Sequence, residues 1–212
     1  MFVDANTRSI VKASTWLCLS ALYFYSAAVL AYQADAVNQD TLHIKKEIPL
    51  MIKFIDQQEI KYWGVTNDGV MGGKSTGEIA FKADHGVFSG RISLQNNGGF
   101  SSIYRVIKPL PQDLEVVSIE VAGDGQPYQM RLMANIEGYR VAYKHNFNTA
   151  AGVRQKISFK LTDFQASFRG RLISNAPKLN SADIGQVGFL ITKKVPGDFS
   201  LSIYNLSFSQ NE

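Results

Sequence analysis

Short runs in which apolar and polar residues alternate cover most of the chain after residue 50. Residues 79–83 and 88–94 alternate on either side of Ala83-Asp84-His85-Gly86, and residues 139–147 and 157–161 follow the same period. A period of two residues places one face of a strand on a core and the other face in water. These runs therefore predict β-strands, and the Asp-His-Gly segment predicts a hairpin turn between the first two.

Other segments show a more specific pattern. Residues 117–121 and 130–134 alternate on either side of a glycine-rich connection, and this arrangement predicts a second hairpin. Residues 187–191 are apolar on both faces, as expected of a central strand. In the last strand the apolar phase changes near Tyr204-Asn205, which predicts a β-bulge at that point.

Helical periodicity is almost absent from the same region. A single short helical turn is predicted over residues 181–184, with Ser181 as its cap. About ten short strands separated by turns are typical of an all-β protein. The pattern therefore predicts a β-sandwich domain over residues 51–210.

An uncharged and strongly apolar block occupies residues 13–32, after the basic residues Arg8 and Lys12. A basic start, an apolar centre and small residues at the end form the pattern of a secretory signal peptide. The block is also long enough to span a bilayer. We therefore interpret residues 1–36 as a signal peptide or, if uncleaved, as a membrane anchor. Either predicts an exported protein, periplasmic or extracellular, or a membrane-anchored one.

Residues 37–50 are polar, show little period and are interpreted as a linker to the domain. Met51 follows directly, and translation from this residue would give a cytoplasmic protein instead. The single cysteine, Cys18, lies in the apolar block, so cleavage leaves a domain without disulfides or thiol chemistry.

Charge and the titratable residues exclude several function classes. The chain carries 22 Lys and Arg against 18 Asp and Glu, a mild excess without clusters, so nucleic acid is not expected as a partner. His43, His85 and His145 are far apart and lack carboxylates at ligand spacing, so no metal is expected. Serine catalysis would need a serine, a histidine and an acid that converge, and the spacing of these residues in the sequence does not indicate such a group. We therefore predict a protein that is not an enzyme and that binds no cofactor.

Two glycine-rich stretches are the most distinctive motifs of the chain. The first is W-G-V-T-N-D-G-V-M-G-G at residues 63–73, and the second is N-N-G-G-F-S-S at residues 96–102. Glycines among small polar residues suit loops in which the backbone turns sharply or packs closely. The first stretch is not a phosphate-binding P-loop, because Asp68 occupies the position of the first glycine. The residues assigned a structural role in these motifs are Gly69, Met71, Gly72, Gly73, Gly98, Gly99 and Phe100.

Candidate binding residues lie in or near these loops. We select Trp63, Asn67, Asp68 and Arg169 as the residues that contact a ligand or partner. For Trp63 two interpretations stay open, a platform for a sugar ring or a partner side chain, and a lid on the core. Other aromatic and guanidinium groups suit polar ligands, but the sequence does not show which of them gather in space. They are Tyr104, Tyr128, Tyr139, Tyr143, Arg105, Arg131, Arg140 and Arg171.

The stretches at residues 63–73 and 96–102 resemble the signature of the complex I intermediate-associated protein 30 family, the NADH:ubiquinone oxidoreductase intermediate-associated proteins. Further blocks at residues 88–90, 163–171 and 184–189 extend this resemblance along the chain. The resemblance implies a galactose-binding-like domain, a jelly-roll β-sandwich. This fold agrees with the strands that the alternating pattern predicts.

The resemblance, which covers about residues 51–208, also implies a function. Eukaryotic members are described as assembly chaperones of respiratory complex I that bind incompletely assembled or unfolded subunits and do not catalyse a reaction. The leading hypothesis is therefore a non-enzymatic protein-binding domain whose partners are subunits of a membrane complex. The alternative is an extracytoplasmic carbohydrate-binding module, suggested by the related fold and the signal peptide. In both hypotheses the membrane is contacted only through an uncleaved N-terminal segment.

Overall fold

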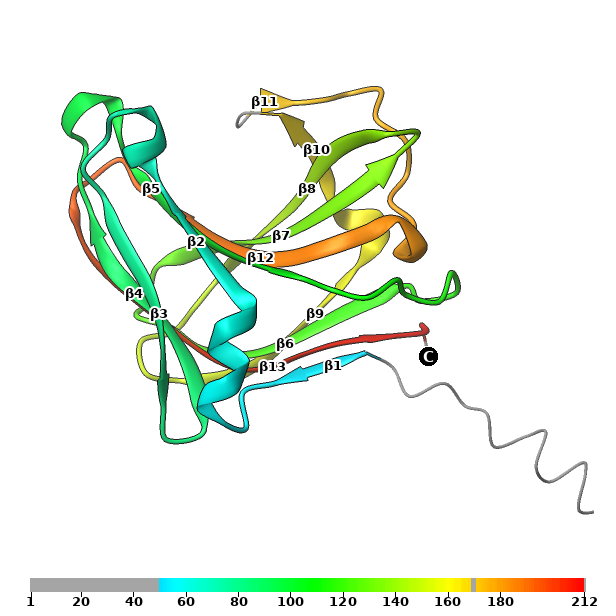
Figure 1. Ribbon diagram of the computed structural model, residues 1–212, viewed down its shortest axis with the longest axis horizontal. Coiled ribbons are helices and arrows are strands. Elements are labelled where there is room, and N and C mark those ends of the chain that lie inside the picture. The colour runs from blue at the N-terminus through cyan, green and yellow to red at the C-terminus, as the bar shows by residue number, and fades with distance from the viewer. Residues whose placement is uncertain (1–49, 169–170, 212) are drawn as a thin grey trace, which may run out of the picture. The chain divides into compact units, whose positions relative to one another are not determined.

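Two antiparallel β-sheets pack face to face in the computed structural model of the chain, which describes residues 50–168 and 171–211 (Figure 1). These residues belong to one compact unit, Pro49–Glu212. The predicted signal or anchor segment, residues 1–36, and the linker up to residue 49 lie outside the described residues, so their roles stay predictions. Among the described residues, no helix is long and apolar enough to cross a bilayer.

Sheet A contains six strands in the order β3-β4-β13-β6-β9, with β1 paired to β13 outside this path. Its strands are β1 (Met51–Lys53), β3 (Thr76–Lys82), β4 (His85–Ile92), β6 (Val116–Ala122), β9 (Arg154–Lys160) and β13 (Gly197–Ser209). Sheet B contains seven strands in the order β11-β10-β8-β7-β12-β5-β2. Its strands are β2 (Trp63–Asn67), β5 (Phe100–Val106), β7 (Pro127–Ile136), β8 (Tyr139–Asn148), β10 (Gln165–Phe168), β11 (Arg171–Leu172) and β12 (Ile184–Thr192).

Helical structure in the described residues is limited to short 3-10 turns in the connections between strands. They are η1 (Gln57–Tyr62), η2 (Asp68–Met71), η3 (Gln95–Asn97), η4 (Leu161–Asp163) and η5 (Ser181–Asp183).

The core lies between the two sheets and is apolar. Phe88, Ile119 and Leu201 enter it from sheet A, and Leu132 and Phe189 enter it from sheet B; all five are fully buried. Removing apolar surface from water contributes on the order of 25 cal/mol per Å² to stability. Because successive strand residues point to opposite faces, the residues between these core positions form the outer face of each sheet.

Three predictions from the apolar pattern are confirmed. The first hairpin is present, since β3 and β4 pair as far as Lys82 and His85. The strand predicted at residues 187–191 is β12, which lies between β5 and β7 inside sheet B. The pairing of β13 with β6 shifts register between Ile203 and Asn205, where the bulge was expected.

The predicted second hairpin is wrong. β6 belongs to sheet A and β7 to sheet B, so the connection between them crosses from one sheet to the other. Both sheets of a sandwich face the same core, so an alternating pattern cannot distinguish a hairpin from such a crossing. Asp124 holds the crossing in place. Its carboxylate accepts hydrogen bonds from the Tyr128 hydroxyl at 3.0 Å and from Ser200 N at 2.9 Å.

The predicted helical turn is present as η5, but its cap differs. Asn180 Oδ1 accepts a hydrogen bond from Ala182 N at 2.9 Å, whereas the Ser181 hydroxyl donates to Pro111 O at 2.5 Å. Asn180 therefore caps the turn and Ser181 anchors it to a neighbouring loop. The described residues form 13 strands rather than about ten, because β1, β10 and β11 are too short to leave a clear pattern. The predicted all-β sandwich is confirmed.

Candidate functional site

The first glycine-rich stretch forms strand β2 and the turn η2, and Asp68 at the start of η2 is fully buried. One carboxylate oxygen of Asp68 accepts a hydrogen bond from Ser75 N at 2.8 Å. The other accepts from the Ser75 hydroxyl, from Gly99 N at 2.6 Å and from Phe100 N at 3.2 Å. Gly99 and Phe100 belong to the second glycine-rich stretch. One buried carboxylate therefore joins the two stretches.

The charge of Asp68 is stabilised inside the protein. Burial by itself raises the pKa of a carboxyl group, because the charged form loses hydration. For Asp68 the hydrogen bonds from Ser75, Gly99 and Phe100 outweigh burial, and the pKa lies below its ordinary value of 3.8. The side chain of Asp68 is fully buried, and its contact with a ligand or partner stays a prediction.

Several glycines of the motifs are required by the space that Asp68 occupies. A Cβ atom at Gly73 would lie 2.3 Å from Asp68 Oδ1, and one at Gly98 would lie 2.6 Å from Asp68 Oδ2. Gly72 has a left-handed φ of 89°, which glycine adopts without steric cost. A Cβ atom at Gly69, by contrast, would meet no atom within 4 Å. Gly99 likewise has a positive φ of 134°. The structural role therefore has a steric or conformational basis at Gly72, Gly73, Gly98 and Gly99 but not at Gly69.

The loop held in this way presents two apolar side chains to water. Val70 is 73% exposed and Met71 is 69% exposed. Asn96 of the second stretch fixes the same loop, because its side-chain amide donates to Gly72 O at 2.9 Å. We call Val70 and Met71 the apolar tip. Met71, expected to be a structural residue, is therefore a surface residue.

Asn67 braces the base of the loop. Its side-chain amide donates to Gly77 O at 3.2 Å, and its carbonyl oxygen accepts from the Ser101 hydroxyl at 2.6 Å. These bonds connect β2 to β3 and β5. Asn67 is half-buried, and its contact with a partner stays a prediction. Arg169 lies outside the described residues, and its role stays a prediction as well.

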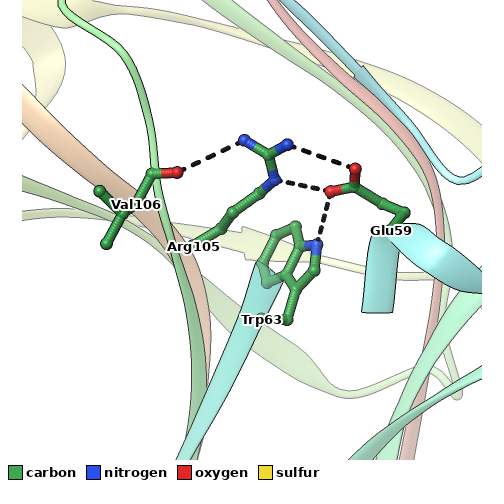
Figure 2. A network of polar contacts seen from close by, with 4 residues as sticks. All are labelled: Glu59, Trp63, Arg105 and Val106. Atoms are coloured by element: carbon green, nitrogen blue, oxygen red, sulfur yellow. Dashed lines mark hydrogen bonds and ion pairs between the residues drawn. The ribbon is translucent and has the colours of Figure 1, made fainter. Parts of the chain in front are cut away.

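Trp63 is part of the core. Its ring stacks between Phe54, at a centroid distance of 5.4 Å, and Phe189, at 6.3 Å. Its Nε1 donates to Glu59 Oε1 at 3.0 Å, and the same oxygen pairs with Arg105 Nε at 2.6 Å (Figure 2). With 7% of its surface exposed, Trp63 has no open ring face for a ligand. The interpretation as a core lid holds, and the interpretation as an exposed platform is wrong.

Sheet B carries a groove of about 370 Å³ on the face that points away from the core. A row of cross-strand neighbours crosses the sheet here, each residue paired with the next, and its members Tyr104, Gly188 and Arg131 line the groove. The full row consists of Gly64, Tyr104, Gly188, Arg131, Lys144 and Gln165. A Cβ atom at Gly64 would lie 2.4 Å from Tyr104 Cζ, so the tyrosine ring lies over Gly64. Gly188 separates Tyr104 from Arg131 in the row and is itself buried.

The groove is positively charged. Arg131 Nη1 donates to Gln129 Oε1 at 3.2 Å, and Arg140 Nη2 donates to Gln186 Oε1. Neither arginine, nor Lys144, belongs to an ion pair found within residues 50–168 and 171–211. Burial lowers the pKa of Arg131, because its charged form loses hydration. Its guanidinium nevertheless keeps its charge at neutral pH.

The sequence named these side chains but did not bring them together. Tyr104 comes from β5, whereas Arg131 and Arg140 come from the hairpin of β7 and β8, and only the insertion of β12 between β5 and β7 brings the tyrosine close to the two arginines. A usable signal was the glycine inside each of two apolar strands, Gly64 beside Trp63 and Gly188 within β12. A glycine in a strand often marks a place where another group approaches closely.

A second cavity, of about 510 Å³, lies beside β10 and β11 and has a mainly apolar lining. The Tyr143 hydroxyl at its border donates to Pro177 O at 2.7 Å. The described residues bring no three His, Cys, Asp or Glu side chains close enough together to hold a metal ion.

The sequence matches the model of the family Complex I intermediate-associated protein 30 (CIA30) over residues 52–203. The chain belongs to this family. The matched region begins in β1 and ends in β13, so it includes both glycine-rich stretches and the groove of sheet B. The resemblance to the CIA30 family is thus confirmed. No curated protein matches the chain in sequence.

Solved structures that resemble this CIA30 chain include carbohydrate-binding modules and agarases. The family 11 carbohydrate-binding module of the cellulosomal cellulase Lic26A-Cel5E of Clostridium thermocellum is 11% identical, with 78% of this chain and 97% of that chain covered and a TM-score of 0.59. An exo-β-agarase is 10% identical, with 76% of this chain and 25% of that chain covered and a TM-score of 0.52. At such identities the likeness shows the fold alone. The predicted galactose-binding-like jelly roll is confirmed.

Proposed function

We propose that the chain is a non-catalytic binding domain that holds incompletely assembled subunits of an NADH:ubiquinone oxidoreductase complex. Membership of the CIA30 family supports this role. The observation that carries it is the apolar tip, Val70 and Met71, exposed on a loop that the buried Asp68 carboxylate holds in one shape.

A rigid loop with exposed apolar side chains suits the binding of other proteins. Apolar groups at a surface gain free energy when a partner removes them from water. Hydrogen bonds from Ser75, Gly99 and Phe100 fix the loop before binding, so less conformational entropy is lost in the complex. The motif carboxylate serves this structural purpose and does not face a cleft, which favours a binder over a hydrolase.

Recovery of partners from the native membrane tests this proposal. The tagged full chain is incubated with detergent-solubilised membranes, and bound NADH:ubiquinone oxidoreductase subunits are identified by mass spectrometry. We expect the wild type to recover such subunits and Val70→Asp to lose them. Val195→Asp is the matched control, because Val195 is 70% exposed on a different loop, against 73% for Val70. Absence of these subunits, or equal recovery by Val70→Asp, would overturn the proposal.

We also propose that the chain acts outside the cytoplasm or on the membrane, through the apolar segment of residues 1–36. A reporter fused after residue 40 is then active outside the cytoplasm, whereas a chain that starts at Met51 stays in the cytoplasm. Equal location of the two fusions would contradict the signal or anchor segment and place the function in the cytoplasm.

A second candidate function is binding of carbohydrate, and a specific observation favours it. Tyr104 lies over Gly64 at the border of an open groove and is 39% exposed. An aromatic ring that lies flat on a sheet offers a face on which a sugar ring can stack. A glycan array with the wild type and Tyr104→Ala tests this candidate. Binding by the wild type that Tyr104→Ala removes supports it, and no binding by the wild type rejects it.

A further inference from the structure

We infer that the groove of sheet B binds an acidic saccharide, with one sugar ring on Tyr104 and a uronic acid carboxylate directed to Arg131. This inference rests on the carbohydrate-binding candidate and adds to it the charge of the ligand and its direction across the strands. Three observations support it. They are the basic residues of sheet B, the strand register that places Tyr104 and Arg131 on either side of Gly188, and the partly buried guanidinium group of Arg131.

The strands of sheet B are strongly asymmetric in charge. Together they contain five Lys and Arg residues and no Asp or Glu. The basic residues are Arg105, Arg131, Arg140, Lys144 and Arg171. Arg105 is neutralised by Glu59, but the groove residues Arg131 and Arg140 have no such partner among the described ion pairs. A surface with one sign of charge attracts ligands of the opposite sign.

Sheet A also has an excess of basic residues, but it contains acids. Its strands carry six Lys and Arg residues against the acidic residues Glu78, Glu120 and Asp198. Glu120 pairs with Arg154 at 2.7 Å, and Asp198 pairs with Arg91 at 2.9 Å. Basic residues without any acidic residue are therefore a property of the sheet B strands and not of the sheet A strands.

The register of sheet B sets the spacing of the groove. Tyr104 and Arg131 are both paired to Gly188, one on each side. With neighbouring strands about 4.8 Å apart, their Cα atoms lie roughly 10 Å from each other. Gly188 is buried, and a Cβ atom there would lie 2.2 Å from Ile103 O, so glycine lets the strands approach closely at this point. A saccharide that stacks one ring on Tyr104 can extend across β12 towards the Arg131 side chain, because both residues line the same groove.

Arg131 is suited to bind a carboxylate. Its guanidinium is partly removed from water, and its one hydrogen bond within the described chain is to the neutral amide of Gln129. A guanidinium can bind a carboxylate through two parallel hydrogen bonds, and these charge-assisted bonds are stronger than neutral ones. Gln186, positioned by Arg140, supplies an amide for sugar hydroxyl groups.

An acidic peptide offers the same carboxylates, but the groove fits it less well. Peptides usually add to a sheet edge or fill an apolar groove. This groove instead lies on the face of the sheet, and its lining combines the Tyr104 ring and the guanidinium groups of Arg131 and Arg140 with apolar residues such as Met133 and Leu190. Ring stacking uses that ring, whereas an extended peptide does not need it. These observations favour the saccharide.

Isothermal titration calorimetry of the full chain tests the inference. The probes are tetrasaccharides of galacturonate, glucuronate, mannuronate and guluronate, each paired with its carboxyl-reduced neutral form, and a poly-glutamate peptide. We expect at least one acidic probe to bind at least tenfold more tightly than its neutral form. Arg131→Gln should remove that difference, and Tyr104→Ala should weaken both forms. Arg91→Gln, on sheet A, is the matched control and should leave binding unchanged, with circular dichroism verifying the fold of each variant.

The alternative outcomes separate the inference from the candidate function on which it rests. Equal binding of acidic and neutral forms that depends on Tyr104 would overturn the acidic inference and leave carbohydrate binding in place. Absence of binding by every saccharide would overturn both. Poly-glutamate binding that Arg131→Gln weakens and Tyr104→Ala does not would replace the saccharide with an acidic peptide.

Discussion

Replacement of Asp68 by asparagine is the sharpest test of the way in which the two glycine-rich stretches are joined. The amide has nearly the same shape as the carboxylate but only one acceptor oxygen. If this oxygen keeps the bonds from Gly99 N and Phe100 N, the new NH₂ group faces the N–H of Ser75. One buried donor is then unpaired, at a cost of about 1–3 kcal/mol, and the remaining bonds lose the assistance of the charge. We expect a total loss of roughly 2–5 kcal/mol in the free energy of unfolding.

Urea unfolding followed by circular dichroism measures this loss. Glu78→Gln is the control, because Glu78 is an exposed residue of β3 and its replacement should change stability by less than about 0.5 kcal/mol. An Asp68→Asn chain within about 0.5 kcal/mol of wild type would refute the reasoning, because a buried acceptor of four hydrogen bonds cannot be lost without cost.

The pH dependence of the stability of the same variant gives an independent measure of what the charged Asp68 carboxylate contributes to the free energy of unfolding. The pKa of Asp68 is lower in the folded chain than its ordinary value of 3.8. The carboxylate therefore contributes its full stability above pH 3.8 and loses it as the pH falls through the lower folded-state pKa. The stability difference between wild type and Asp68→Asn should be constant near neutral pH and should shrink below that range. A difference that grows on acidification would contradict this assignment.

The other predictions concern single residues of the motif and the groove. Gly73→Ala should lower the free energy of unfolding by at least about 1 kcal/mol, because its Cβ meets a buried carboxylate, whereas Gly69→Ala should be neutral; equal urea midpoints would contradict this. Gly64→Ala should leave the fold intact but displace the end of the Tyr104 ring, and calorimetry should show at least tenfold weaker saccharide binding. Trp63→Phe should cost roughly 2–4 kcal/mol through its lost hydrogen bond and smaller ring, yet leave partner recovery unchanged. Loss of the partner at normal stability would instead make Trp63 a contact residue.

The strands of the sandwich could be predicted because one face of each lies on a core, and burial leaves a period of two in the sequence. The bulge between Ile203 and Asn205 could be predicted for the same reason, since an extra residue shifts that period. The pairing of strands could not be predicted in the same way. The crossing from β6 to β7 and the short strands β10 and β11 depend on contacts between distant segments, which local alternation does not record.

The site was predicted in part, and the error at Trp63 has a simple cause. Successive residues of a strand point to opposite faces of the sheet, so an aromatic residue and the glycine beside it lie on different faces. The sequence does not say which of the two faces is buried. The structure turns Trp63 into the core and Gly64 outward, so the glycine carries a different ring, that of Tyr104. Whether the Tyr104 ring binds a ligand stays a proposal.

The proposed binding surface has two parts, the loop with the apolar tip and the groove of sheet B. Their residues come from different parts of the sequence, so the two parts can be tested separately. The stretches that carry the resemblance to the CIA30 family contribute the Asp68 carboxylate, the apolar tip and the glycines Gly64 and Gly188. Tyr104 and Arg131 lie outside those stretches. The motif residues therefore hold the loop and place Gly188 in the groove, whereas the aromatic ring and the charge of the groove come from residues outside the motifs. Partner recovery can succeed while acidic saccharides fail to bind, and the reverse result would assign this chain a ligand that its family alone does not predict.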